Sequence, residues 1–164
     1  MGIENVLTNG GPAIVIVTGQ DPTCYGVNDG TIVISATGTG LTYSINDGLS
    51  YQSLAFFQNL SSGTYTVLVK DATGCQTFQT ITLSQPEKIN SIIFGSNSAC
   101  NASNGSASVI ASGGDGNFTY AWNDAQLQQS SSASGLPAGQ YTVTITDGNS
   151  CSVLDSVIIG NNGG

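Results

Sequence analysis

Four cysteines are the residues whose chemistry and spacing stand out first in this chain of 164 residues. They are Cys24, Cys75, Cys100 and Cys151, and the interval between the first two equals the interval between the last two. Thiols can form disulfides or bind a metal, but zinc ligands usually come as CxxC pairs or with histidine, and the chain has neither. Four cysteines allow three disulfide pairings, and any of them would indicate an oxidising compartment outside the cytoplasm.

Acidic side chains are the second group that could do chemistry, since the chain has ten Asp and Glu but no His. A Ser or Cys nucleophile needs a nearby base, which is usually His. Two carboxylates can hydrolyse a glycosidic bond. Asp29, Asp47, Asp115 and Asp124, however, stand beside Gly, Asn or Ala, where Asp favours turns. We therefore predict that the chain is not an enzyme.

Two acids could instead bind a cation. Asp71 and Asp147 occupy equivalent positions in two similar segments, and Asn28, Asp29 and Asn104 are further oxygen donors that could complete a Ca²⁺ site. No DxDxDG loop is present, and an acid at a strand end is commonly a turn residue. We predict no cofactor, with Ca²⁺ as the alternative.

Charge limits the partners. Lys70 and Lys88 are the only cations, and the formal net charge is -8. Nucleic acids and anionic membrane surfaces both bind through Lys and Arg, so neither is a predicted partner. The longest apolar run, residues 13–17, is too short to span a bilayer, and we predict no membrane insertion.

Two nearly identical segments organise the chain, namely "GTYTVLVKDATGC" at residues 63–75 and "GQYTVTITDGNSC" at residues 139–151. The same offset in numbering relates Cys24 to Cys100, and this shared period predicts two repeats at residues 12–86 and 87–162. "NVLTNGG" at residues 5–11 resembles "VIIGNNGG" at residues 157–164. We expect residues 1–11 to be the end of a preceding repeat or a linker, and residues 163–164 to link to a following repeat.

The sequence of each repeat predicts about six strands, in which apolar and polar residues alternate with a period of two. In the first repeat we predict strands at residues 13–18, within 30–38 and 41–48, at 51–59, in the quoted segment, and at 76–83. Short strands with frequent turns predict an all-β fold of two tandem immunoglobulin-like sandwiches. The alternation places these residues in the cores: Tyr43, Tyr65, Val67, Val69, Tyr120, Trp122, Tyr141, Val143 and Ile145.

Two further readings concern the aromatic residues. Tyr120 and Trp122 could stack on a sugar ring, but the equivalent positions hold Tyr43 and Ile45, which favours a core role. Tyrosine at the head of a late strand is similar to the tyrosine corner of immunoglobulin-like domains.

The strand count also favours one disulfide pairing. Cys24 lies between the first two predicted strands and Cys75 between the last two, so four strands separate them. An even number returns the chain to the same end of a sandwich, whereas a fifth strand would place the two loops at opposite ends. The duplication then predicts one disulfide per repeat, Cys24 with Cys75 and Cys100 with Cys151.

In the second repeat, Cys100 is followed by "NGS" from Asn104, "GG" from Gly113, "FTYAW" ending at Trp122, and "GLPAGQYTVTITDGNSC" at residues 135–151. This combination resembles the SprB repeat of Bacteroidetes cell-surface proteins. The first repeat departs from it by Ile45 in place of Trp and by "LSSGTY" in place of "LPAGTY". The resemblance implies a large secreted surface adhesin or filament, in the name-giving case the mobile adhesin of gliding motility, exported by the type IX system.

The sequence therefore predicts a non-catalytic structural repeat module that spaces a distal adhesive region from the cell. Its expected partners are neighbouring repeats of the same chain, with surface polysaccharide as a further candidate. Its expected location is extracellular, at the cell surface. Thr, Ser, Asn and Gln on the outward faces would make an inert surface. The alternatives are a carbohydrate-binding surface module and an accessory domain of a secreted enzyme.

Overall fold

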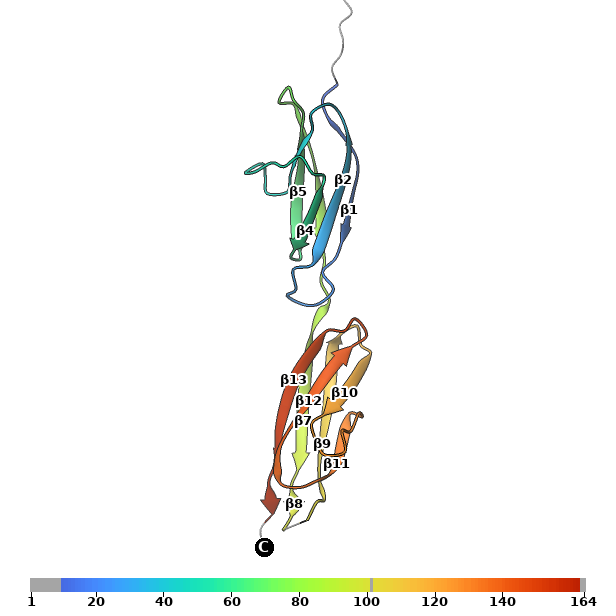
Figure 1. Cartoon of the computed structure of the whole chain (residues 1–164), viewed down its shortest axis with the longest axis vertical. Coiled ribbons are helices and arrows are strands. Elements are labelled where there is room, and N and C mark those ends of the chain that lie inside the picture. The colour runs from blue at the N-terminus through green and yellow to red at the C-terminus, as the bar shows by residue number, and fades with distance from the viewer. Residues whose placement is uncertain (1–9, 101, 163–164) are drawn as a thin grey trace, which may run out of the picture. The chain divides into compact units, whose positions relative to one another are not determined.

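The computed structural model describes residues 10–100 and 102–162, and the regular elements within these residues are all β-strands. The chain divides into two compact units (Figure 1). The first holds the chain up to Pro22 and Gly26–Gln85, and the second holds Thr23–Tyr25 and the chain from Pro86 onward. Most of the expected preceding repeat, residues 1–9, and the expected linker at residues 163–164 lie outside the described residues.

From residue 10 onward, the first unit has six strands in two antiparallel sheets. One sheet has the order β1-β2-β4, formed by β1 (Ala13–Gln20), β2 (Gly30–Thr37) and β4 (Phe56–Leu60). The other has the order β3-β5-β6, formed by β3 (Thr42–Ser44), β5 (Gly63–Lys70) and β6 (Gln76–Leu83).

The second unit repeats this arrangement. Its first sheet has the order β11-β9-β7, formed by β7 (Glu87–Ser96), β9 (Gly105–Gly114) and β11 (Ser132–Leu136). Its second sheet has the order β10-β12-β13, formed by β10 (Phe118–Trp122), β12 (Gly139–Asp147) and β13 (Ser152–Ile159). A short parallel pair, β8 (Ser98–Ala99) with β14 (Asn161–Asn162), completes the unit.

These sheets have the pairing of an immunoglobulin-like sandwich. The first, second and fourth main strands form one sheet and the third, fifth and sixth form the other, as in a constant-type domain that lacks its fourth strand. The Tyr65 hydroxyl donates a hydrogen bond to the Ser61 carbonyl at 2.8 Å, and the Tyr141 hydroxyl donates one to Pro137 at 3.0 Å. Both are tyrosine corners, and the predicted all-β, immunoglobulin-like class is confirmed.

Each unit has its own hydrophobic core. Of the residues expected in the first core, Tyr43, Val67 and Val69 are buried and Tyr65 is half-buried against them. In the second unit Trp122, Val143 and Ile145 are buried, while Tyr120 and Tyr141 are half-buried. The two corner tyrosines cover the edge of their cores because each keeps its hydroxyl at the surface to reach a turn carbonyl.

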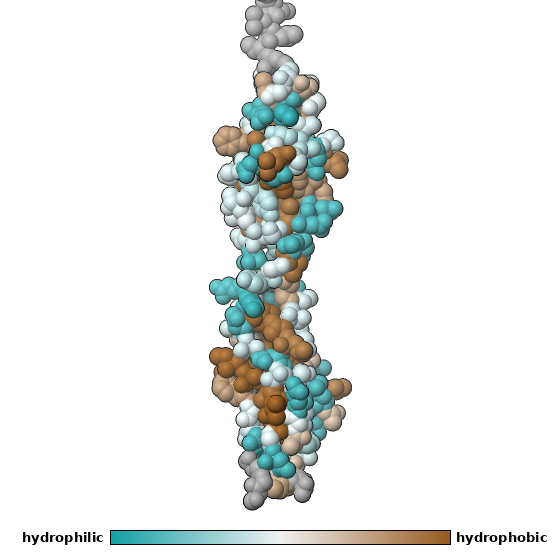
Figure 2. All heavy atoms as spheres, turned by 90° about the vertical axis from the view of Figure 1, so that its left-hand side faces the viewer, coloured by the Kyte–Doolittle hydropathy of each residue, from teal (hydrophilic) through white to brown (hydrophobic). Residues whose placement is uncertain are grey.

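The outward faces differ from the inert surface that the sequence suggested. Ile92 and Ile110 form a cross-strand pair on β7 and β9, and both are exposed, as is Phe94. In the first unit Val33 and Phe56 form an exposed cross-strand pair on β2 and β4. Figure 2 shows hydrophobic atoms interspersed with polar ones on the face that it draws.

A chain reversal that the sequence did not reveal separates β3 from β4. The strand β3 is antiparallel to β5, and β5 turns back from β4 within two residues, so β3 and β4 run in the same direction. The chain therefore returns between them, and Gln52 forms an isolated antiparallel bridge with Tyr43 on this return. The prediction of one strand at residues 51–59 is wrong, because the segment contributes this bridge and the separate strand β4.

Candidate functional site in the cysteine-bearing turns

The turn from Asp71 to Cys75 joins β5 to β6 and is built around one carboxylate. Asp71 Oδ1 accepts hydrogen bonds from the backbone N–H of Thr73 at 2.9 Å, the Thr73 hydroxyl at 2.7 Å, and the backbone N–H of Cys75 at 3.0 Å. The Asp71 N–H donates to the Cys75 carbonyl at 3.0 Å, which closes the turn. A carboxylate at this position thus holds the cysteine backbone in place.

The turn from Asp147 to Cys151 joins β12 to β13 in the same way. Asp147 Oδ1 accepts from the N–H of Asn149 at 3.0 Å and from the N–H of Cys151 at 2.9 Å. The Asp147 N–H donates to the Cys151 carbonyl at 2.9 Å. The repetition of sequence therefore reproduces one local structure with a cysteine at its end.

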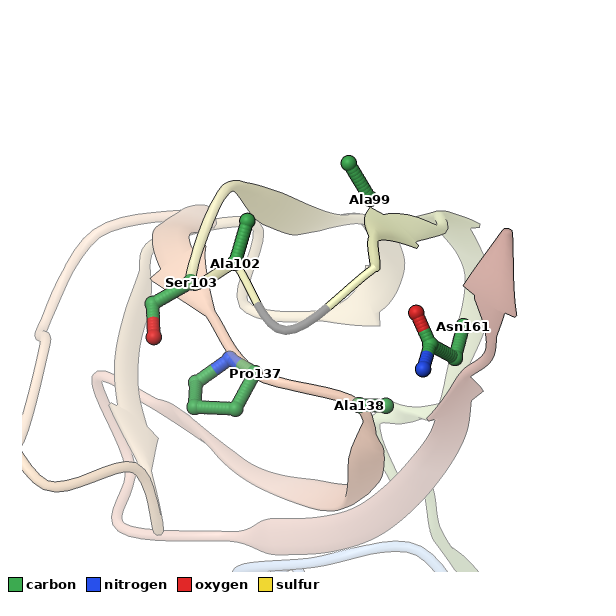
Figure 3. A pocket seen from close by; sticks show the side chains of 6 residues that line it. All are labelled: Ala99, Ala102, Ser103, Pro137, Ala138 and Asn161. Carbon is green, nitrogen blue, oxygen red and sulfur yellow. The ribbon is translucent and has the colours of Figure 1, made fainter. Parts of the chain in front are cut away.

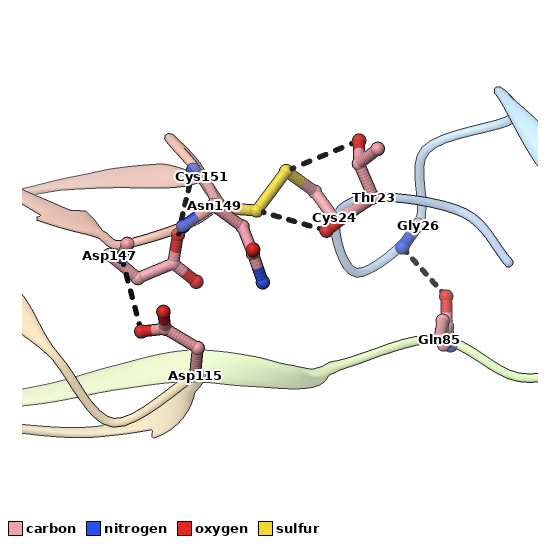
Figure 4. Close-up of a disulfide and its surroundings, with 9 residues drawn as sticks. Thr23, Cys24, Gly26, Gln85, Asp115, Asp147, Asn149 and Cys151 are labelled. Atoms are coloured by element: carbon pink, nitrogen blue, oxygen red, sulfur yellow. Dashed lines mark hydrogen bonds between the residues drawn. A yellow bond between two sulfur atoms is a disulfide. The ribbon is translucent and has the colours of Figure 1, made fainter.

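Electrostatics in these turns follow the hydrogen bonds. The hydrogen bond from the Thr73 hydroxyl lowers the pKa of Asp71 below its ordinary value of 3.8; desolvation opposes this, and the backbone N–H groups of Thr73, Cys75 and Gly74 lower the pKa further. The backbone N–H groups of Asn117 and then Gly148 lower the pKa of Asp115, beside the second turn (Figure 4). Both acids therefore act as hydrogen-bond acceptors for turns, and the lowered pKa makes them poor proton donors at neutral pH.

Asp124 has the same role in another loop. Burial raises its pKa, but hydrogen bonds from the Gln128 side chain and from the backbone N–H groups of Gln128 and Gln126 outweigh burial, so the pKa is lowered overall.

Within each unit, the oxygen donors considered for Ca²⁺ lie in separate loops. Asp71 lies in the β5–β6 turn, whereas Asn28 and Asp29 lie in the loop between β1 and β2. Asn104 accepts from the N–H of Ala99 in the loop after β8, far along the second unit from the turn at Asp147. Among the described residues no group of three or more acidic, Cys or His side chains could hold a metal ion. Calcium binding stays a prediction from the sequence, because backbone and amide oxygens, which are outside this group, can also coordinate Ca²⁺.

The two cysteines of the first repeat, Cys24 and Cys75, are separated by the length of β1. An added Cβ on Gly11, just before β1, would lie 3.3 Å from the Cys75 Cβ, so Cys75 is at the end where the chain enters. Asp21, just after β1, accepts from the Ser84 N–H at 2.8 Å, at the end where the chain leaves. The intervening strand β1 has eight residues and spans roughly 26 Å, whereas bridged Cα atoms lie within about 7 Å.

The predicted pairing of Cys24 with Cys75 and of Cys100 with Cys151 is therefore wrong. The return segment between β3 and β4 supplies the fifth crossing that places the two loops of a repeat at opposite ends. Cys24 is instead bonded to Cys151, with 5.7 Å between their Cα atoms and 127 residues between them in sequence (Figure 4). Cys75 is an exposed free thiol, and Cys100 is exposed.

The segment that carries Cys24 explains how this bond forms. The chain leaves the first unit after Pro22, contributes Thr23–Tyr25 to the second unit, and re-enters the first at Gly26. The Thr23 carbonyl oxygen lies 3.4 Å from the Cys151 sulfur (Figure 4). The sequence analysis missed this pairing because it assumed that both cysteines of a disulfide belong to the same repeat. The period of the sequence equally allows Cys24 to bond to Cys151, the counterpart of Cys75 one repeat later.

Two hollows among the described residues have linings without an acid and a base. A hollow of about 300 Å³ in the second unit is lined by small uncharged residues (Figure 3), which are Ala99, Ala102, Ser103, Pro137, Ala138 and Asn161. A smaller one of about 160 Å³ in the first unit includes Tyr51 and Phe57, and Lys70 Nζ lies 4.0 Å from the centre of the Tyr51 ring. Neither lining, as described, contains an acid and a base.

The proposed sugar platform is not formed by Tyr120 and Trp122. Trp122 is 2% exposed and its indole N–H donates to the Ser130 carbonyl at 2.9 Å, so the ring belongs to the core.

Within the described residues, no helix is long and apolar enough to cross a membrane.

Solved structures with a similar trace have low sequence identity. The C-terminal 282-residue fragment of intimin, solved with the intimin-binding domain of the translocated intimin receptor, matches 92% of this chain at 11% identity and a TM-score of 0.43. The chain spans 64% of that fragment. The first two immunoglobulin domains of DIP-gamma match 92% of this chain and 97% of their own length at 11% identity and a TM-score of 0.46. Murine CEACAM1b matches 89% of this chain and all of its own length at 13% identity and a TM-score of 0.35.

No curated protein matches the chain. Residues 95–127 match the family model of the SprB repeat, and this segment runs from the end of β7 through β9 and β10. The match includes Cys100, "NGS" and "FTYAW", which are among the motifs that carried the resemblance. The resemblance of the second unit to the SprB repeat family is thereby confirmed.

Proposed function

We propose that this chain is a non-catalytic repeat module of a large secreted cell-surface adhesin or filament, and that it spaces a distal adhesive region from the cell. The observation that carries the proposal is that each unit has its own core and the same strand pairing, in step with the period of the sequence. Such units can be added in series without redesigning their neighbours.

The path of the chain through a unit suits this role. The first and last strands of the first unit, β1 and β6, both run antiparallel to their sheet neighbours β2 and β5, and both follow the direction of β4. The chain therefore enters at one end of the unit and leaves at the other. An eight-residue strand spans roughly 26 Å, so each unit advances the chain by at least about this length.

The surface location is supported by two observations. The disulfide between Cys24 and Cys151 suits an oxidising, extracytoplasmic environment. The SprB-repeat match at residues 95–127 supports a place in a cell-surface protein. We extend the proposal to an adhesin of the gliding-motility type that is exported by the type IX system. The absence of catalysis is supported by the use of Asp71, Asp115 and Asp124 as turn acceptors.

A display experiment tests the spacing role. One, two or three copies of residues 12–162 are placed between an outer-membrane anchor and a peptide epitope, and the distance of a gold-labelled antibody from the membrane is measured by electron microscopy. We expect a constant increment with each copy. A distance that does not rise with copy number would overturn the proposal.

The hollow beside Tyr51 favours carbohydrate binding as the second candidate, because aromatic and amide side chains line it together. Lys70, however, already lies over the Tyr51 ring. A glycan array probed with the full chain is expected to be silent. Saturable binding that is lost in Tyr51→Ala but kept in Phe78→Ala, whose side chain is exposed on β6, would favour this alternative.

A further inference from the structure

The period of the sequence relates the four cysteines in two equivalent sets. Cys100 is the counterpart of Cys24 one repeat later, and Cys151 is the counterpart of Cys75. The disulfide joins Cys24 of the first repeat to Cys151 of the second, which is the position that Cys75 occupies in the first. The bond therefore runs from the loop after the first strand of one repeat to the late turn of the next repeat.

Cys75 is placed as its bonded equivalent is. Its N–H donates to Asp71 Oδ1 at 3.0 Å, and the N–H of Cys151 donates to Asp147 Oδ1 at 2.9 Å. Both turns close with a bond from the Asp N–H to the Cys carbonyl. Cys75 differs in being an exposed free thiol at the end where the chain enters the first unit.

We propose that Cys75 forms the same disulfide with a cysteine at the position of Cys24 in a repeat that precedes this chain, so that one staple recurs at every repeat boundary. The inference rests on the proposed array function. Its independent support is the bond that the equivalent cysteine, Cys151, makes.

The chemistry of the step is thiol–disulfide exchange. Each of the two thiols loses its proton and one electron as the S–S bond forms. The two electrons and two protons pass to a disulfide oxidant, either a thiol–disulfide oxidoreductase or a low-molecular-weight disulfide, which becomes two thiols.

The test uses the full chain followed by a second copy of residues 12–162 in one polypeptide, which recreates the missing boundary. Here Cys75 of the second copy stands in the repeat that follows Cys100 of the first. Both this protein and the single chain are refolded with oxidised and reduced glutathione, purified as monomers, alkylated, denatured and digested with trypsin. Cleavage after Lys70 and Lys88 releases residues 71–88, in which Cys75 is the only cysteine.

The measurement is the fraction of the peptide 71–88 that is released without reductant. We expect all of it from the single chain, and about half from the doubled chain because the second copy is held by Cys100 of the first. Cys100→Ser in the first copy is the matched control and should return the release to completion. Circular dichroism checks that this variant folds.

Complete release from the doubled chain, with both bonds between Cys24 and Cys151 intact, would overturn the recurring staple. The array function would survive this result, since it is tested separately by the distance gained per displayed copy. Retention of the peptide in the single chain would also overturn the inference, because Cys75 would then pair inside the chain.

Discussion

At the scale of single residues, the tyrosine corners show how one side chain can both pack against the core and stabilise a turn. Tyr65 and Tyr141 each lie half-buried against their core, and each reaches a carbonyl four residues earlier. The ring contributes packing and the hydroxyl fixes the turn before the strand. Because the two rings are only half-buried, replacing either tyrosine by Ala should cost less free energy of unfolding than truncating a fully buried aromatic residue. The contribution of the hydroxyl can be tested by itself.

Removing the Tyr141 hydroxyl should weaken the second unit by the value of one hydrogen bond. Tyr141→Phe leaves the Pro137 carbonyl without its donor, and we expect a loss of about 1 kcal/mol in the free energy of unfolding. Urea denaturation measures this change. Tyr120→Phe is the matched control on the same sheet and should stay within about 0.5 kcal/mol. Equal losses in the two variants would contradict a special role for the corner hydroxyl.

Asp71 should make stability depend on acidic pH. Because its folded pKa lies below 3.8, the charged carboxylate stabilises the fold above its unfolded pKa, and this contribution is lost as pH falls through the folded value. Asp71→Asn keeps an oxygen acceptor but removes the charge. We expect the variant to melt below the wild type at pH 7 and the difference to shrink as the pH falls below 3.8. A difference that is independent of pH would mean that charge has no part in the turn.

At the scale of elements, the return segment between the third and fourth main strands decides where the loops lie. Gln52 Nε2 donates to the carbonyls of Leu54 and Phe56 at 2.8 and 2.9 Å, so this side chain holds the segment to the start of β4. Gln128, at the equivalent position of the second repeat, donates to the Ser134 carbonyl at 3.0 Å and to Asp124. One glutamine per repeat therefore fixes the reversal that places the cysteines at opposite ends.

Truncating this glutamine should loosen the return segment. Gln128→Ala removes the two donors and also the acceptor for the Ser134 N–H, and we expect a loss of roughly 1 to 3 kcal/mol in the free energy of unfolding. Hydrogen exchange at the amide of Ser134 should rise with it. Gln129→Ala, at the exposed neighbouring position, is the control and should change neither quantity. A silent Gln128→Ala would show that the backbone alone holds the reversal.

At this scale the sequence predicted the long strands, whose apolar and polar residues alternate regularly. Alternation of apolar and polar residues found β5, β6, β12 and β13, because long strands keep a period of two over many residues. The third strand was also predicted, within residues 41–48, although it has only three residues; the return beside it makes a single bridge at Gln52 and leaves no periodic signal. The wrong disulfide pairing followed from this one uncounted reversal. The glutamine that recurs at the same place in both repeats was a signal that could have marked it.

At the scale of the whole molecule, the disulfide changes which parts of the chain can carry load. A pull on the two termini passes along β1 to Cys24, through the disulfide to Cys151, and along β13 to the end. The residues between the two cysteines, which include five of the six strands of the first unit, lie outside this path. If the chain spaces an adhesive region as proposed, the bond would keep the residues between Cys24 and Cys151 from being extended when a unit unfolds.

Single-molecule force spectroscopy should show this restraint as missing length. With the bond intact, unfolding cannot extend the 127-residue interval, and reductant should release about 420 to 460 Å of additional contour length in one step. Cys151→Ser should give the longer extension without reductant, whereas Cys75→Ser should behave as the wild type because Cys75 is a free thiol. Two staples inside the repeats would instead hide two shorter loops, and reduction would release two steps of about 170 to 180 Å each. The size of the step therefore distinguishes a bond that joins successive repeats from one that closes each repeat on itself.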